Sequence, residues 1–259
     1  MQGDGYALVT GASRGLGMAF AREFAQRRHN LVLVALHPEP LQAFAEELRR
    51  STPISVTAMD ADLSVPGAGQ ALAARLAQQG LSIDILVNNA GFGLRGEFRQ
   101  IPLQRQLEML RLNNEVVVEL TYALLPAMLN RPQKAVVNIS STAGFQPIPY
   151  ASGYAATKAF LTTFSLALEQ ELRSSGVTVV TVCPGRLSKR DPAASPQPAQ
   201  KKWGGIIQDP EDVVRHTFRV LANGGGLVVP GALNKFSVFA QRLIPRKLVP
   251  RLVAKMSRA

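Results

Sequence analysis

Short runs of apolar residues alternate along this chain with longer segments in which apolar and polar residues recur at helical spacing. The apolar runs are rich in Val, Ile and Leu, which is typical of strands that are buried on both faces. They predict strands at Tyr6–Thr10, Leu31–Ala35, Ile54–Met59, Ile83–Asn88, Lys134–Ile139, Val177–Val182 and Leu227–Val229.

The segments between these runs predict the helices. Their apolar residues recur every three or four positions, as on one face of a helix. We expect helices at Gly15–Arg28, Leu41–Arg50, Gly67–Gln79, Leu103–Asn130 and Ser152–Ser175. Apolar strands that alternate with helices predict an α/β fold, in which a single doubly wound parallel sheet of Rossmann type carries helices on both faces.

Two regions interrupt the alternation. Residues 188–205 are rich in Pro, Ala, Gln and Lys and predict a loop or lid. Trp203 within it could line an apolar pocket or anchor the lid to the domain. Residues 233–259 repeat apolar residues at helical spacing between Lys and Arg, and Pro245 and Pro250 divide this segment into two or more short helices. We therefore expect one domain over residues 1–232 and a basic amphipathic extension over 233–259.

Composition indicates a folded domain in a reducing compartment. The 259 residues are 46% hydrophobic, which suffices for one large core. The single cysteine, Cys183, cannot form a disulfide within the chain, which favours a cytoplasmic protein. Cys183 ends an apolar run, so a buried structural thiol is favoured over a nucleophile. No segment has the pattern of a signal peptide or of a membrane span.

The net charge of +11 is concentrated near the C-terminus. Residues 1–212 hold twenty Lys or Arg against eighteen Asp or Glu, whereas the residues after Asp212 hold nine Lys or Arg and no acidic residue. This asymmetry indicates an anionic partner. The extension could lie on an anionic membrane surface, peripherally, or dock an acidic carrier protein or another subunit. It could also pack on its own domain with solvated cations. A nucleic-acid partner is not expected, because no binding motif accompanies the charge.

A glycine-rich loop joins the first predicted strand to the first helix. Thr10–Gly17 places glycines at positions 11, 15 and 17. Glycines at such a junction allow a tight turn and a close approach of a pyrophosphate to the helix N-terminus. The placement predicts a dinucleotide site, although the spacing differs from G-x-G-x-x-G.

The charges around this loop favour NADP(H). A carboxylate after the second strand would bind the ribose hydroxyls and repel a 2′-phosphate, but the chain has Leu36 and His37 there. Arg14 in the loop could pair with the phosphate. The alternative for Arg14 is a solvated loop cation.

Tyr154 and Lys158 lie four residues apart in a predicted helix, so their side chains project from the same face. An adjacent ammonium favours the phenolate, so we expect Lys158 to lower the pKa of Tyr154 from about 10 toward neutrality. Ser141 follows an apolar strand and could place a hydroxyl beside the phenol. Such a pair could exchange a proton with a carbonyl or alcohol oxygen. Taken alone, the pattern is more often that of a solvated helix face.

The motifs together resemble the short-chain dehydrogenase/reductase family over about residues 6–230. The matching elements are Thr10–Gly17 (TGxxxGxG), Asp62 (the acidic residue that contacts adenine), Asn88–Gly91 (NNAG), the tetrad Asn113, Ser141, Tyr154 and Lys158, and Pro184-Gly185 (the PG turn). So many motifs in order make the resemblance specific.

The resemblance implies a role for each member of the tetrad. Tyr154 would donate a proton to the substrate carbonyl during reduction, and Ser141 would hydrogen-bond the same oxygen. Lys158 would lower the tyrosine pKa and bind the nicotinamide ribose, and Asn113 would hold a water that relays protons to Lys158. The cofactor would supply the hydride. No metal is expected.

The resemblance also implies a set of cofactor-binding residues: Gly11, Ser13, Arg14, Gly15, Leu16, Gly17, Asp62, Leu63, Asn89, Ala90, Gly91, Tyr154, Lys158, Pro184, Gly185 and Leu187. Two departures stand out. Leu36 and His37 lie where NADP-preferring members often have arginine, and Lys189 lies where many members place a threonine against the nicotinamide amide. Ser188 or backbone groups are the candidates to replace that threonine.

The sequence therefore predicts an NADP(H)-dependent oxidoreductase that interconverts a carbonyl and an alcohol, on an apolar ketone or acyl-type substrate. Phe92 and Phe145 are candidates to line the pocket. The alternative is a non-catalytic NADP-binding regulatory or scaffold protein, against which the intact tetrad argues. The resemblance also implies a homodimer or homotetramer formed through Leu103–Asn130 and Ser152–Ser175.

Overall fold

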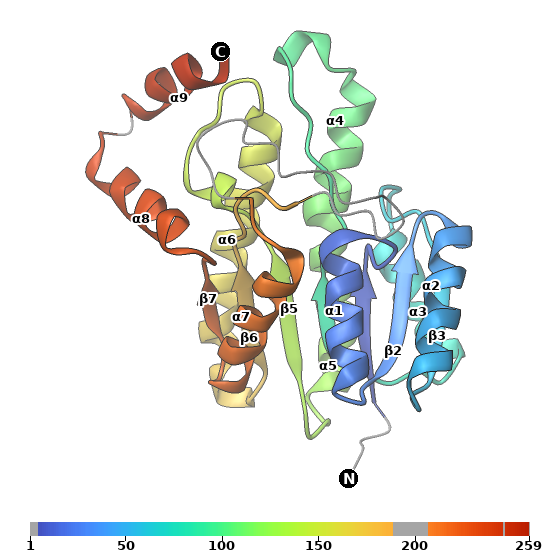
Figure 1. Cartoon of the computed structure of the whole chain (residues 1–259). Helices are drawn as coiled ribbons and strands as arrows, with labels where there is room; N and C mark the ends of the chain where they lie inside the picture. Colours follow the sequence, from blue (N-terminus) through green and yellow to red (C-terminus); the bar gives the residue numbers. More distant parts are fainter. Residues whose placement is uncertain (1–4, 189–206, 246, 259) are drawn as a thin grey trace.

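A single parallel sheet forms the centre of the molecule (Figure 1). The computed structural model describes residues 5–188, 207–245 and 247–258. Within these ranges the strands are arranged in the order β3-β2-β1-β4-β5-β6-β7. They are β1 (Tyr6–Thr10), β2 (Asn30–Ala35), β3 (Val56–Asp60), β4 (Ile83–Asn88), β5 (Ala135–Ile139), β6 (Thr178–Val182) and β7 (Gly226–Val228). This order confirms the predicted doubly wound fold, with its switch point between β1 and β4.

Helices cover both faces of the sheet (Figure 1). The longer ones in the described residues are α1 (Gly15–Gln26), α2 (Pro38–Ser51), α3 (Ala68–Gln78), α4 (Leu103–Leu110), α5 (Val116–Met128), α6 (Ser152–Leu172), α7 (Pro210–Ala222), α8 (Ala232–Ala240) and α9 (Val249–Arg258). Short turns of helix are η1 (Phe98–Gln100), η2 (Arg111–Glu115), η3 (Thr142–Phe145), η4 (Arg173–Ser175) and η5 (Gln241–Leu243). One core lies between the sheet and α1, α2 and α7, and the other between the sheet and α3, α5 and α6.

Successive residues of the central strand point into different cores. Ala7 and Val9 belong to the core under α1, while Leu8 belongs to the core under α5. All three side chains are fully buried, which explains why the strand is apolar throughout rather than alternating. The helices on the first face are joined by aromatic rings, since Phe24 of α1 and Phe218 of α7 have ring centroids 4.8 Å apart.

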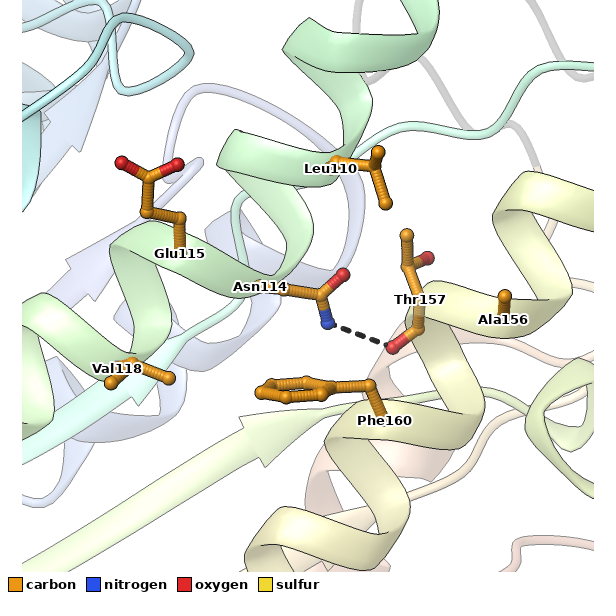
Figure 2. Close-up of a pocket in the computed structure, with 7 residues that line it drawn as sticks. All are labelled: Leu110, Asn114, Glu115, Val118, Ala156, Thr157 and Phe160. Carbon is orange, nitrogen blue, oxygen red and sulfur yellow. Dashed lines mark hydrogen bonds between the residues drawn. The ribbon is translucent and has the colours of Figure 1, made fainter.

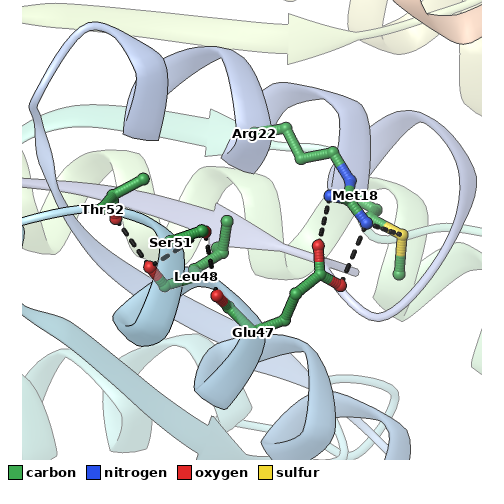
Figure 3. Close-up of polar contacts among 6 residues, drawn as sticks. All are labelled: Met18, Arg22, Glu47, Leu48, Ser51 and Thr52. Carbon is green, nitrogen blue, oxygen red and sulfur yellow. Dashed lines mark hydrogen bonds and ion pairs between the residues drawn. The ribbon is translucent and has the colours of Figure 1, made fainter.

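An ion pair fixes α1 against α2 on the same face (Figure 3). The Arg22 guanidinium donates to both carboxylate oxygens of Glu47, with a Nη2 to Oε2 distance of 3.1 Å. Close by, the Thr52 hydroxyl donates to the carbonyl oxygen of Leu48 at 2.7 Å and so caps the end of α2. The fork-shaped guanidinium gives the Arg22–Glu47 ion pair more directional specificity than a lysine would. The ion pair joins the two helices whose N-termini follow β1 and β2.

The observed strands agree with the predicted ones to within two residues at each end. The helices differ more. Helix α2 begins at Pro38, earlier than expected, because proline is well tolerated in the first turn. The predicted helix Leu103–Asn130 is divided into α4, the π-helical η2 and α5. Helix α7 is not among the predicted elements, although Asp209 caps it and Val213, Val214, Thr217 and Phe218 give it a buried face.

The C-terminal extension forms short helices, as predicted. Helix α8 is followed by η5, and Pro245 lies between η5 and α9. Pro250 lies in the first turn of α9 and so begins a helix rather than interrupting one. Within the described residues, no helix combines the length and the apolar character needed to span a bilayer.

Cys183 is fully buried in a small cluster with Val229 and Val238. Burial raises the pKa of its thiol, so the thiolate is disfavoured. This confirms the interpretation of Cys183 as a structural thiol.

Candidate active site

The carboxyl ends of β1, β4 and β5 form the floor of the site. Val9 of β1 pairs with Val87 of β4, so the loops that follow these strands leave the sheet side by side. One of them is the glycine loop after Thr10, and the other contains Asn89, Ala90 and Gly91. Ligands of open α/β sheets bind at such a switch point.

The glycine loop adopts a conformation that other residues would resist. Gly11 and Gly15 have φ values of +65° and +55°. A Cβ on Gly17 would lie 2.3 Å from the Gly11 carbonyl oxygen, so only glycine allows the first turn of α1 to approach the loop this closely. A Cβ on Gly15 would meet no atom within 4 Å, so the loop has open space on that side.

Thr10 and Asn89 hold the two loops together. The Thr10 hydroxyl accepts hydrogen bonds from the backbone N–H groups of Asn89 and Ala90, each at 3.0 Å. The Asn89 amide donates to the carbonyl oxygens of Thr10 at 2.8 Å and Gly11 at 3.2 Å. Asn89 was expected to contact the cofactor, but its amide hydrogens are used within the protein. Its side chain therefore shapes the site from behind.

Exposed polar residues surround this floor. Arg14, His37 and Asp62 are all exposed, and Ser13 is half-buried. Asp62 accepts hydrogen bonds from the Ser64 N–H at 2.9 Å and the Ser64 hydroxyl at 2.6 Å, which orients its carboxylate. Leu36 and His37 follow β2 directly, and no carboxylate occupies either position.

Two predicted cofactor residues have buried side chains. Leu16 and Leu63 are 6% and 4% exposed and belong to the two hydrophobic cores. Their side chains therefore do not face the site, and only their backbone groups could contact a cofactor there. The sequence motif does not distinguish a backbone contact from a side-chain contact.

Tyr154 and Lys158 lie on α6 at the end of β5. The Lys158 ammonium is 6.0 Å from the centroid of the Tyr154 ring and donates to the carbonyl oxygen of Ile139 at 2.8 Å. Ser141 follows Ile139 by two residues, and its hydroxyl donates to the carbonyl oxygen of Pro184 at 3.4 Å. The same hydroxyl lies close enough to the phenol of Tyr154 to influence its pKa. The structure thus brings Ser141, Tyr154 and Lys158 together, as the sequence predicts.

The direction of the tyrosine pKa differs from the expectation. Burial raises the pKa of Tyr154 above its usual value, and the nearby Ser141 hydroxyl offsets this only in part. Burial also lowers the pKa of Lys158 from 10.5 to about 8. The expected lowering of the tyrosine pKa by the lysine is therefore wrong for the chain by itself, because desolvation disfavours both charged groups.

Asn113 lies in the π-helical η2 and is fully buried. Its amide donates to the carbonyl oxygen of Phe92 and to the Thr157 hydroxyl, each at 3.0 Å, and its oxygen accepts from the Phe92 N–H at 3.1 Å. A Cβ on Gly91 would lie 2.8 Å from this oxygen and 3.7 Å from the Lys158 nitrogen. Asn113 is therefore adjacent to Lys158 and ties the loop after β4 to α6. A single π-turn at such a place is common at functional sites.

Gln208 holds the turn at Pro184 and Gly185 and is absent from the sequence-predicted set. Its oxygen accepts from the Gly185 N–H at 2.8 Å, and its amide donates to the carbonyl oxygen of Pro230 at 2.7 Å. Its backbone also forms an isolated bridge with Leu187. No sequence motif singles out Gln208, since its partners are distant in the chain.

Ser188 has an unusual hydroxyl group. The oxygen is buried and has no hydrogen-bond partner among the residues that the structure describes. Lys189, Trp203 and most of the predicted lid lie outside the described residues.

Two hollows lie near this site. A small cavity beside Tyr154 is lined by Leu94, Gly96, Phe98, Ile101, Gln106, Met109, Tyr150, Ala151, Ser152, Gly153 and Tyr154. A more open groove of about 410 Å³ lies between α5 and α6 (Figure 2). Its lining includes Leu110, Val118 and Phe160 but none of the predicted tetrad. The groove is therefore a surface feature separate from the predicted catalytic residues.

Comparisons with known proteins match the chain to one family. The family model described as short chain dehydrogenase matches residues 5–195. An NADP-dependent 3-hydroxy acid dehydrogenase from Salmonella typhi is 36% identical over 179 residues, which cover 69% of this chain and 71% of that protein. A very-long-chain 3-oxoacyl-CoA reductase from Coprinopsis cinerea is 32% identical over 179 residues, which cover 68% of this chain but only 53% of that protein.

A solved structure has the same fold. It is a short-chain dehydrogenase from Sphingobium yanoikuyae in complex with NADPH, with a TM-score of 0.78 and 31% sequence identity. The alignment covers 92% of this chain and 94% of that chain.

Proposed function

The chain belongs to the short-chain dehydrogenases, and on that premise we propose that it is an NADP(H)-dependent oxidoreductase that interconverts a carbonyl and an alcohol. The observation that carries the proposal is the closeness of the Ser141 and Tyr154 hydroxyl groups beside the buried Lys158. Two hydroxyl groups that converge at one point can bind a single carbonyl oxygen. A scaffold protein would not need this arrangement.

The hydroxyl groups divide the work between binding and proton transfer. Ser141 is held by the Ala143 N–H, which donates to its oxygen at 3.1 Å. Its own hydrogen is directed to the carbonyl oxygen of Pro184, 3.4 Å away. It can turn to a substrate oxygen when one is bound and stabilise negative charge on it. Tyr154 donates its proton to the same oxygen when the carbonyl is reduced, and accepts it back when the alcohol is oxidised. A raised phenol pKa keeps Tyr154 protonated before reduction.

Lys158 and Asn113 support proton transfer by Tyr154. With a pKa of about 8, Lys158 is largely protonated near neutral pH but can release a proton at modest cost. Its hydrogen bond to Ile139 fixes the ammonium at the strand end, close to Gly91 and Asn113. The group can therefore return a proton toward Tyr154 after each reduction. Asn113 positions α6 and the loop at Phe92 by its three hydrogen bonds.

The loops after β1 and β4 fit a nicotinamide dinucleotide. The bare surface at Gly15 and the N-terminus of α1 suit a pyrophosphate. We propose that the backbone at Ser13, Leu16, Ala90 and Leu187 supplies further contacts, with Asp62 at the adenine end. The Ser188 hydroxyl, which has no partner among the described residues, is our candidate to replace the threonine that binds the nicotinamide amide in many relatives, with backbone groups as the alternative. When bound, the cofactor would supply or accept the hydride.

We further propose a preference for NADP(H) over NAD(H). Neither Leu36 nor His37 after β2 carries a negative charge that would repel a 2′-phosphate, and the exposed Arg14 provides a positive one. The Sphingobium yanoikuyae enzyme was solved with NADPH, and the Salmonella typhi relative is described as NADP-dependent.

The proposed substrate is an apolar ketone or an acyl-type molecule. The cavity beside Tyr154 measures only about 10 Å³, so a substrate must widen it, and the apolar side chains of Leu94, Phe98, Ile101 and Met109 are in its lining. Both relatives named above are described with an oxygen function at carbon 3 of an acyl chain. A 3-oxoacyl thioester or acid is thus the first class to test.

We also propose a homodimer or homotetramer that buries the groove of Figure 2. Exposed apolar side chains line it, with Leu110, Val118 and Phe160 at 43%, 38% and 44% exposure. Apolar area of this kind on paired helices favours self-association. Light scattering of the protein in solution would show the mass of the assembly.

Deuterium transfer tests the proposed reaction. NADPH with both hydrogens at carbon 4 replaced by deuterium is incubated with the protein and a panel of 3-oxoacyl thioesters, aryl ketones and keto steroids, and the products are analysed by mass spectrometry. We expect one deuterium on the former carbonyl carbon and one NADPH consumed per alcohol formed. No labelled alcohol from any member of the panel would contradict the proposal.

A further inference from the structure

Helix α8 exposes a row of large apolar side chains. Leu233, Phe236, Phe239 and Leu243, in α8 and the turn that follows it, are 58%, 69%, 59% and 74% exposed. Their spacing of three, three and four residues places them on one side of the helix. We call these four residues the apolar row. Four adjacent side chains of this size are more than the single exposed leucines that are normal on protein surfaces.

The opposite side of α8 is packed on the domain. Val238 is buried against Cys183 and Val229. Asn234 donates to the carbonyl oxygen of Pro230 at 2.9 Å, and a Cβ on Gly185 would lie 2.5 Å from the Asn234 nitrogen. Helix α8 is thus packed on the domain by one side, and the apolar row is exposed on the other side.

The anchoring points belong to the edge of the proposed active site. Gly185 is in the turn expected to contact the cofactor, and Phe145, which packs on the cluster around Val238, lies four residues after Ser141. Figure 1 shows α8 and α9 beyond the carboxyl ends of the strands, at the same end of the sheet as α4. A surface bound by the apolar row would therefore lie near the entrance to the site.

The charge around the apolar row has one sign. Lys235 on α8, Lys247 just before α9 and Arg251 within α9 are exposed, and no Asp or Glu occurs after Asp212 in the chain. Two further leucines, Leu248 and Leu252, are 44% and 49% exposed. Exposed apolar side chains flanked by cations are the pattern that partitions into an anionic membrane interface.

We propose that the apolar row and its flanking cations form a docking surface for an anionic lipid bilayer, so that the entrance to the active site faces the membrane. A second copy of the chain is a poor occupant, because its own extension would bring a like charge to the contact. An apolar ridge also suits a bilayer, whose acyl chains conform to it, better than it suits a rigid protein surface. Uptake of an apolar substrate from the bilayer would follow, and that consequence rests on the proposed function.

Vesicle flotation of the full chain tests the docking. The vesicles are phosphatidylcholine alone or phosphatidylcholine with phosphatidylglycerol, at low and high salt. We expect binding that requires phosphatidylglycerol and is lost at high salt. Phe236→Ser with Phe239→Ser should weaken binding by roughly tenfold per phenylalanine. Lys235→Gln and Arg251→Gln should each weaken it by about fivefold.

Matched control variants distinguish binding through this surface from non-specific binding to vesicles. Val65→Ser removes another exposed apolar side chain, and Arg50→Gln removes an exposed cation on α2, so neither should change flotation. Wild-type protein that ignores anionic vesicles, or floats equally with neutral ones, would overturn the proposal. A second result would also overturn it: wild-type protein does not bind vesicles, and the double phenylalanine variant forms smaller assemblies than the wild type in light scattering. The apolar row would then bind a second copy of the chain.

A soluble ketone keeps the two proposals distinguishable. If the wild type reduces this ketone without vesicles but never binds them, the docking fails and the proposed function stands. If it binds vesicles but never transfers a hydride to any ketone, the docking stands and the proposed function fails. Circular dichroism of each variant verifies that the fold is retained.

Discussion

The Lys158 ammonium donates its hydrogen bond to the carbonyl oxygen of Ile139, at 2.8 Å. The Lys158 side chain is thereby held by the strand that leads to Ser141. The backbone carbonyl oxygen of Lys158 accepts hydrogen bonds from the hydroxyl groups of Ser140 at 2.8 Å and Thr162 at 3.0 Å. One residue thus connects β5 to α6 at both its ends. This connection holds α6, which carries Tyr154, against the end of the strand that leads to Ser141.

Tyr154→Phe should abolish most turnover but keep cofactor binding. The substitution removes the group proposed to transfer the proton and leaves the ring packed against Gly93, where a Cβ would lie 3.0 Å from it. We expect kcat to fall by about 10²–10⁴-fold with the dissociation constant of NADPH unchanged. Stopped-flow turnover and isothermal titration measure the two effects. Tyr122→Phe, at an exposed position of α5, is the matched control and should behave as the wild type.

Lys158 should make the stability of the fold depend on pH in the alkaline range. Its pKa falls from 10.5 in the unfolded chain to about 8 in the fold, so between these values the unfolded chain binds more protons. The free energy of unfolding that Lys158 contributes therefore rises as the pH increases from about 8 toward 10.5.

Urea denaturation of wild type and Lys158→Met, at several pH values between about 7 and 10, measures this effect. The difference in the free energy of unfolding should shift in favour of the wild type by up to about 3 kcal/mol. Parallel curves for the two proteins would show that Lys158 is not desolvated as the structure indicates.

The fold and the composition of the site could be predicted from the sequence because both depend on local patterns. Buried parallel strands such as Leu31–Ala35 are apolar throughout, and the glycines of Thr10–Gly17 are fixed by backbone geometry. The reversal of strand order between β1 and β4 then brings the loops after these two strands together, so their proximity follows from the topology alone. The resemblance to a family supplied the tetrad, which the structure places around one point.

The remaining features depend on tertiary burial. The helical spacing of Tyr154 and Lys158 predicted a lowered tyrosine pKa, but desolvation reverses the direction and acts through residues far away in the chain. The π-turn at Asn113 continues a helical pattern and so has no signature of its own. Helix α7 has a clear N-cap at Asp209, yet the Pro- and Gln-rich segment before it masked the start of a new element.

Arg14 should determine the choice between NADPH and NADH. Arg14→Ala removes the cation that we propose pairs with the 2′-phosphate, so KM for NADPH should rise by about tenfold or more. The KM for NADH, which lacks the phosphate, should stay within about twofold. Initial-rate kinetics with both cofactors give the ratio. Arg50→Ala on α2 is the control, and equal losses with both cofactors would mean that Arg14 supports the loop rather than the phosphate.

Gln208→Ala should weaken the binding of the cofactor and leave the rate of the chemical step unchanged. The side chain binds the Gly185 N–H and the Pro230 carbonyl oxygen, so its loss frees the turn that follows β6. We expect KM for NADPH to rise by about three- to tenfold, with kcat within about twofold, because Ser141 and Tyr154 are untouched.

Gln208→Glu refines this prediction. The carboxylate can still accept from the Gly185 N–H but cannot donate to Pro230. If the Gly185 contact positions the cofactor, the KM of this variant should lie closer to the wild type than that of Gln208→Ala. Gln170→Ala, on an exposed face of α6, controls for the loss of a glutamine. A lower melting temperature with unchanged KM in Gln208→Ala would instead make Gln208 a stabilising residue of the β6–β7 edge, without influence on the cofactor.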